Sequence, residues 1–135
     1  MKFYSLNNQN IKVSFKDAVI AGIAPDKGLY FPESITPLPS DFFENIEELS
    51  NQEIAFQAIH QFVNEDIPDE ALKEIIANTL DFDFPVVDIE ESVATLELFH
   101  GPTMAFKDVG ARFMANCLGN FSQGEKQDVT VLVAT

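Results

Sequence analysis

Apolar residues recur at helical spacing along the chain as far as Leu80. Ser14 and Ser50 each stand three positions before an acidic residue, the spacing of a capping box at a helix start. We expect the helix after Ser14 to end at Gly22, and a later helix to start at Pro68. The predicted buried faces are Phe15, Ala18, Val19 and Ile23; Phe42, Phe43, Ile46 and Leu49; Ile54, Ala55, Ala58, Ile59, Phe62 and Val63; and Leu72, Ile75, Ile76 and Leu80.

After Pro85 the apolar residues no longer follow helical spacing and instead form short, strand-like runs. Residues 86–89 and 93–99 are typical of strands, and Thr103 is placed to cap a helix that runs to Gly119. Phe106 is expected on the buried side of that helix. Residues 129–134 form a continuous apolar, β-branched run, which is typical of a strand buried on both faces of a parallel sheet.

These elements predict an α/β fold. A mostly helical N-terminal domain, residues 1–80, is followed by the start of a parallel-sheet domain, residues 81–135. A parallel strand needs a crossover connection and further strands, so we expect the chain to be a fragment of a longer α/β protein. The strand at 129–134 would then present an unpaired edge, through which we expect the fragment to associate with itself or with other chains.

Because of its composition, several classes of partner and site are expected to be absent from this chain. The formal net charge is −14, which repels nucleic acid and acidic membrane surfaces. Cys117 is the single cysteine, so neither an internal disulfide nor a cysteine-based zinc site is expected. The acidic runs 44–48 and 81–83 are interpreted as solvated faces and turns, and no metal site is predicted. No signal peptide or apolar run of spanning length is seen, so we expect a soluble, cytoplasmic protein.

The stretch Leu96–Gly110, LELFHGPTMAFKDVG, carries the candidate chemistry. Its pattern predicts a strand, a sharp turn at residues 100–102 and a helix start with Lys107 in the first turn. The positive end of the helix dipole, together with burial, would disfavour the charged form of the Lys107 amine. A neutral amine is what Schiff-base chemistry needs. The alternative interpretation is a solvated surface lysine.

The same stretch resembles a known family. The segment PTMAFKD, residues 102–108, is similar to the P-T-x-x-F-K-D segment of fold-type II pyridoxal-phosphate enzymes. The longer string LELFHGPTMAFKD resembles the threonine synthase branch. Residues 15–19 and 22–33 are similar to the N-terminal domain of that branch, and VTVLVAT, residues 129–135, is similar to its next strand. The resemblance therefore runs in order along nearly the whole chain.

The resemblance implies a cofactor, a reaction and a set of site residues. Pyridoxal 5'-phosphate would be held by Lys107 through a Schiff base, and O-phospho-L-homoserine and water would become L-threonine and phosphate. Lys107 would then also move protons along the substrate carbons. Phe106, Thr103 and Thr135 are further candidates for contact with the cofactor, although we favour a core position for Phe106 and a helix-capping role for Thr103.

The neighbours of Lys107 are expected to serve the structure. We expect Asp108 to stabilise the helix start or order the loop, and His100 to form a structural hydrogen bond. Gly101 and Gly110 are interpreted as positions of close backbone approach. Arg112 is not assigned to phosphate binding.

Several alternatives stay open at this stage. The chain contains no glycine-rich strand–loop–helix that could cradle the cofactor phosphate, so we expect the fragment alone to be inactive. The parent could be a threonine-synthase-like phospho-lyase or another fold-type II enzyme such as a dehydratase. A hypothesis of another class is a non-catalytic interaction module.

Overall fold

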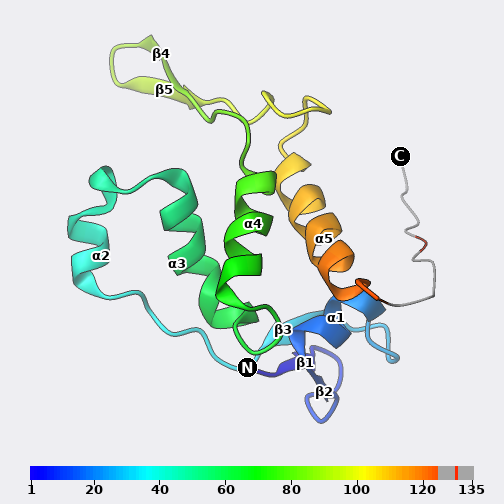
Figure 1. Ribbon diagram of the computed structural model, residues 1–135. Coiled ribbons are helices and arrows are strands. Elements are labelled where there is room, and N and C mark those ends of the chain that lie inside the picture. Colours follow the sequence, from blue (N-terminus) through cyan, green and yellow to red (C-terminus); the bar gives the residue numbers. More distant parts are fainter. Residues whose placement is uncertain (125–129, 131–135) are drawn as a thin grey trace.

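A computed structural model describes residues 1–124 and 130, and it consists of short strands and helices (Figure 1). The strands are β1 (Phe3–Ser5), β2 (Lys12–Val13), β3 (Tyr30–Pro32), β4 (Val86–Glu90) and β5 (Val93–Leu96). The helices are α1 (Phe15–Ala21), α2 (Ser40–Glu44), the 3-10 helix η1 (Ile46–Glu48), α3 (Asn51–Val63), α4 (Asp69–Thr79) and α5 (Asp108–Phe121).

Serine caps begin two of the helices, as the spacing predicts. The Ser14 hydroxyl accepts a hydrogen bond from the Asp17 amide, 3.0 Å away. At α3 the box is reciprocal, because the Ser50 hydroxyl accepts from the Glu53 amide at 3.2 Å and the Glu53 carboxylate accepts from the Ser50 amide at 2.8 Å. Each bond satisfies an amide that would otherwise lack a partner in the first helical turn.

The three-stranded sheet has the order β2-β1-β3, and both pairings are antiparallel. Phe3 lies in the central strand, where it faces Val13 on one side and Pro32 on the other. Its ring packs against that of Phe15 at a centroid distance of 5.8 Å. This small sheet therefore attaches to the helices through the first turn of α1.

The core lies among the helices. Helix α4 packs against both α3 and α5, and Figure 1 shows it between them. The buried cluster joins Val63, Ile67, Leu72, Ile75, Ile76, Cys117 and Phe121. Phe15 of α1 also meets Phe121 edge to face, with ring centroids 6.1 Å apart. Helix α5, which follows Lys107, is therefore fixed to the helices of the N-terminal 80 residues by a shared core.

Two predicted helical faces are wrong in part. Gly22 has a φ of 69°, which ends α1 before Ile23, so that side chain leaves the helical face and is 58% exposed. Residues 41–49 do not form one helix: α2 ends at Glu44, and a separate 3-10 turn follows. Phe42 is buried, whereas Phe43 is exposed, and the two rings meet edge to face with their centroids 5.2 Å apart.

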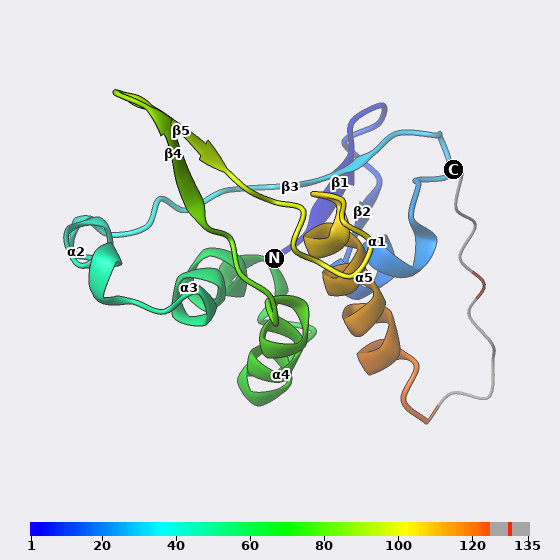
Figure 2. The ribbon, with the colours of Figure 1, turned by 90° about the horizontal axis from the view of Figure 1, so that it is seen from above.

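The predicted strands after Pro85 form a hairpin and not a parallel sheet. β4 and β5 pair antiparallel, with an irregularity between Asp88 and Glu90, and β5 ends at Leu96 and not at Phe99. Figures 1 and 2 show the hairpin projecting away from the helices. No parallel pairing occurs within residues 1–124, and the predicted strand 129–134 lies outside the described residues. The described part of the fold is thus mixed, with helices and two antiparallel sheets.

Within the described part of the chain, no helix combines the length and the apolar character that crossing a bilayer requires.

Candidate functional site

Lys107 lies immediately before α5 and not inside its first turn. The helix begins at Asp108, and Lys107 occupies the N-cap position with φ −74° and ψ −11°. The expected start at Thr103 is wrong, because residues 101–107 form turns in which the Met104 amide donates to the Gly101 carbonyl at 3.0 Å. Thr103 is therefore not the cap of this helix.

The Asp108 side chain closes the turn that presents Lys107. Its carboxylate accepts hydrogen bonds from the Thr103 amide, at 3.0 Å, and from the Thr103 hydroxyl. The Asp108 amide in turn donates to the Ala105 carbonyl at 3.0 Å. Asp108 is buried, and the hydrogen bonds from Thr103 hold the pKa of its carboxyl below the ordinary value of 3.8. We call residues 101–108 the Asp108 clasp.

A glycine is required where the clasp closes. A Cβ atom on Gly101 would lie 2.4 Å from Oδ2 of Asp108, which is far inside van der Waals contact. The predicted close approach at Gly101 is therefore confirmed. Apart from its chain neighbours and the backbone of its own helix, Gly110 has no atom within 4 Å of the equivalent position, so the same prediction for Gly110 is wrong. The expected structural role of Asp108 is confirmed by its bonds to Thr103.

The side chain of Lys107 is exposed in this chain, and so is its neighbour Phe106. The amine nitrogen lies 5.7 Å from the centre of the Phe106 ring. The expected core position of Phe106 is wrong, because the residue precedes α5 and its ring does not lie on the apolar stripe of that helix. Within residues 1–124, Lys107 makes no ion pair, so its amine is accessible to a reagent.

The other polar residues near the clasp are engaged in local bonds. His100 lies 2.6 Å from the Glu97 carboxylate and its ring stacks on Phe99, which confirms the expected structural hydrogen bond. Arg112 pairs with Asp81 at 2.7 Å and donates to the Asn78 carbonyl. These bonds connect the start of α5 to the end of α4 and the residues directly after it.

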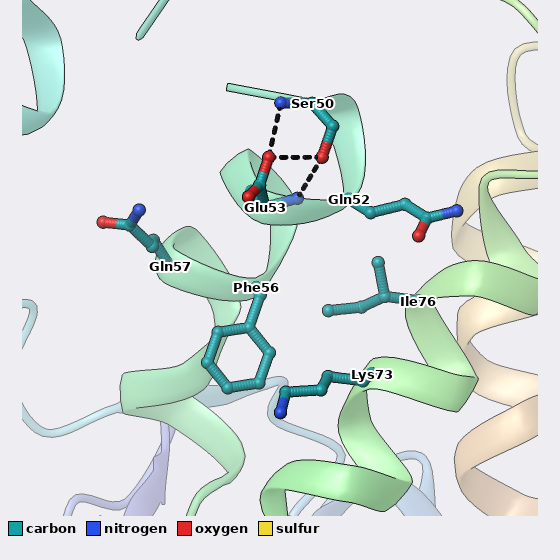
Figure 3. A pocket seen from close by; sticks show the side chains of 7 residues that line it. All are labelled: Ser50, Gln52, Glu53, Phe56, Gln57, Lys73 and Ile76. Carbon is teal, nitrogen blue, oxygen red and sulfur yellow. Dashed lines mark hydrogen bonds between the residues drawn. The ribbon is translucent and has the colours of Figure 1, made fainter. Parts of the chain in front are cut away.

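A cavity of about 500 Å³ opens between α3 and α4, away from the clasp in sequence (Figure 3). It is lined by Ser50, Gln52, Glu53, Phe56, Gln57, Lys73 and Ile76. Its charged groups already have partners, because Glu53 completes the cap of α3 and Lys73 pairs with Glu70 at 2.7 Å. None of the lining residues comes from the stretch 96–110, and nothing in the sequence pattern pointed to this cavity.

Two other expectations concern ligands. Thr135, the remaining candidate for cofactor contact, lies outside the described residues. Residues 1–124 contain no cluster of three or more histidine, cysteine, aspartate or glutamate side chains that could hold a metal ion.

Comparison with known proteins places the sequence in one family. Residues 2–80 match the family model described as "Threonine synthase N terminus". Threonine synthase of Escherichia coli strain K12 is 40% identical over 138 residues, a match that covers 100% of this chain and 31% of that enzyme. Threonine synthase of Saccharomyces cerevisiae is 36% identical, covering 91% of this chain and 28% of the yeast enzyme. The chain thus spans about a third of the length of these curated relatives.

Solved structures share the fold. The crystal structure of threonine synthase from Escherichia coli matches with a TM-score of 0.85 and 37% identity, over 90% of this chain and 28% of that one. A PLP-bound threonine synthase from Brucella melitensis matches with a TM-score of 0.84 and 29% identity, over 91% and 28% of the two chains. With a family model that covers more than half of its residues, this chain belongs to the threonine synthase family and resembles its N-terminal region.

Proposed function

We propose that this chain carries the cofactor lysine, Lys107, of a threonine synthase that converts O-phospho-L-homoserine and water to L-threonine and phosphate. The observation that carries the proposal is the Asp108 clasp, which presents an accessible amine from a closed turn at the start of α5, a helix that packs one side against the core. Family membership supports the reaction, and the Brucella melitensis relative supports pyridoxal phosphate as the cofactor.

The described residues supply the amine to which the cofactor would be attached. The covalent attachment needs a primary amine without a competing carboxylate, and Lys107 supplies one. Phe106, whose ring centre lies 5.7 Å from that amine, stays a candidate for contact with the cofactor. No glycine-rich strand–loop–helix that could cradle the cofactor phosphate occurs among residues 1–124, so in this proposal other residues of the enzyme hold that phosphate.

The roles of the residues follow from their positions. When bound, pyridoxal phosphate supplies an electron sink for negative charge on the substrate carbons. The Lys107 amine would hold the cofactor and, once released from it, take and return protons at those carbons. The bonds between Asp108 and Thr103 hold the backbone around Lys107, so its side chain leaves the main chain from a defined position.

The proposal is tested by joining this chain to the part of the Escherichia coli enzyme that lies beyond the match, and by assaying phosphate and threonine formed from O-phospho-L-homoserine. The Lys107→Ala variant should lose activity by at least about a thousandfold, since the same amine attaches the cofactor and transfers the protons. Lys2→Ala, which removes another exposed amine, is the matched control and should keep its activity.

Two results would contradict the proposal in different ways. Unchanged activity in the Lys107→Ala protein would remove Lys107 from the chemistry. Phosphate release without threonine would keep Lys107 but assign the chain to a related phospho-lyase.

A further inference from the structure

Met104, in the middle of the Asp108 clasp, combines a strained backbone with an exposed apolar side chain. Its φ is 56°, in the left-handed region that a residue with a Cβ atom seldom adopts. Lys27 and Ser92 share this region, but both are polar and lie in exposed loops. The Met104 side chain is 77% exposed, the largest fraction among the exposed large apolar residues that the structure describes. Exposure alone is ordinary, but its combination with backbone strain needs a reason.

The turn itself does not require a methionine at this position. The Met104 amide donates to the Gly101 carbonyl at 3.0 Å, and the next carbonyl, that of Ala105, accepts from the Asp108 amide at 3.0 Å. These bonds hold the left-handed conformation, which costs free energy for every residue except glycine. Glycine would close the same turn without that cost. The methionine is therefore explained by its side chain, and strained residues of this kind gather at sites that bind ligands.

Met104 and Lys107 leave the main chain from the same closed turn. The hydrogen bonds of Asp108 to Thr103 and to Ala105 bracket both residues. Three residues of chain span at most about 11 Å, so the two Cα atoms cannot lie farther apart than that. Phe106, which is also exposed, has its ring centre 5.7 Å from the Lys107 amine. The turn that presents the amine thus carries one flexible and one flat apolar side chain.

We propose that Met104 is a specificity-determining residue that contacts the carbon chain of the substrate, an amino acid bearing a phosphate ester. This inference rests on the proposed function of Lys107, because carbons that exchange protons with that amine must come close to the clasp. Those carbons change shape as bonds break and form, and an unbranched thioether side chain adapts to such changes. The flat ring of Phe106 is better suited to the flat ring of the cofactor.

Oxidation of the methionines by hydrogen peroxide tests this contact without using activity. The protein that joins this chain to the remaining part of the Escherichia coli enzyme is loaded with pyridoxal phosphate. It is then mixed with the phosphonate isostere of the substrate, in which a methylene group replaces the bridging oxygen, so that phosphate is not released. Mass spectrometry follows sulfoxide formation on each methionine peptide.

We expect Met104 to be oxidised at least about fivefold more slowly with the isostere than with the cofactor alone, because the bound ligand covers the thioether. Met114, which is 41% exposed, is the internal control and should be oxidised at the same rate in both samples. Equal oxidation of Met104 in the two samples would overturn the proposal. Protection of Met104 by the cofactor alone, with no further effect of the isostere, would also overturn it.

Borohydride labelling of the same protein separates this inference from the proposed function. A pyridoxyl label on Lys107, together with unprotected Met104, would reject the substrate contact and keep the role of Lys107. Absence of that label would reject the role of Lys107 and the substrate contact with it.

Variants separate the side chain of Met104 from its backbone. Met104→Ala and Met104→Gly both remove the thioether, so each should lower kcat/KM for O-phospho-L-homoserine by about tenfold, as expected when an apolar contact of this size is lost. Met104→Leu, which roughly keeps the volume, should recover most of that loss. Only glycine relieves the strain, so the unfolding constant of the chain in urea should be at least about threefold smaller for Met104→Gly than for Met104→Ala. Met114→Ala is the matched control for kcat/KM.

Three results with these variants would contradict the proposal. Unchanged kcat/KM in both truncated proteins would mean that the side chain touches no substrate. A loss in Met104→Ala that Met104→Gly restores would assign the residue to the backbone of the turn alone. Equal stability of the alanine and glycine variants would remove the strain on which the inference is built.

Discussion

Replacing Leu72 by alanine tests whether α5 and the helices before it unfold together. Leu72 is completely buried in α4, inside a cluster that also holds Val63 of α3 and both Cys117 and Phe121 of α5. Truncating a fully buried leucine removes its transfer free energy and leaves a cavity, a loss of about 3 kcal/mol and up to about 5. Because the cavity would border α5 as well as α3, both helices should lose stability.

The expected loss in Leu72→Ala is a large part of the total free energy of unfolding. A domain of this size is stable by about 5–15 kcal/mol, so the midpoint of thermal unfolding should fall by roughly 10 °C. The measurement is urea unfolding followed by circular dichroism, combined with hydrogen exchange of the amides in α3 and α5. Leu29→Ala is the matched control: Leu29 is 62% exposed, and its truncation should change the free energy of unfolding by less than about 0.5 kcal/mol.

Two results would refute this reasoning about the core. A loss below about 1 kcal/mol in Leu72→Ala would mean that the site collapses around the cavity or is not packed as described. Exchange that accelerates in α3 but not in α5 would mean that α5 is stabilised independently of the N-terminal helices. In that case the shared core would not position the clasp.

Three further predictions concern α5 and the clasp. Gly110→Ala should stabilise the chain by about 0.5–1 kcal/mol in urea unfolding, because Gly110 lies in a helix with free space around it. Gly101→Ala should destabilise the chain, because its Cβ atom would meet Asp108. The opposite order of the two stabilities would contradict the geometry of the clasp. The lowered pKa of Asp108 means that its ionised carboxylate stabilises the folded chain above the unfolded pKa, and that this stabilisation is lost as the pH falls through the folded pKa. The NMR signal of the Thr103 amide should therefore shift only below about pH 4, and a shift near neutral pH would contradict this. Burial raises the pKa of Cys117 to about 12, so iodoacetamide at pH 8 should modify it in urea but not in the folded chain, as mass spectrometry can show.

The helical part of the fold was predictable because local rules decide it. The serine at position 50 and the glutamate three residues later satisfy each other, and Leu72, Ile75 and Ile76 lie on one face of α4 at the expected spacing. Ile23 was misplaced because the left-handed turn at Gly22 ends the face that the periodicity seemed to continue. Periodicity reports which side of a helix is apolar but not where a turn interrupts it.

The sequence motif makes Lys107 a candidate residue, but it does not predict the geometry of the residues around it. The motif pointed to Lys107, yet Thr103 could be expected to cap the helix because threonine is a common N-cap residue. The Thr103 hydroxyl and amide instead donate hydrogen bonds to the Asp108 carboxylate, and the helix begins only at residue 108. The exposure of Phe106 and of the hairpin could not be derived, since an apolar pattern shows that a residue favours burial but not whether the described chain buries it.

Mapping the attachment of the cofactor tests the role of Lys107 most directly. The chain, joined to the remaining part of the Escherichia coli enzyme, is incubated with pyridoxal phosphate, reduced with borohydride, digested and analysed by mass spectrometry. We predict that the pyridoxyl group is found on the peptide that contains Lys107, and that the Lys107→Ala protein carries none. A label on another lysine of the joined protein, or the same amount of label in Lys107→Ala, would contradict the assignment of Lys107.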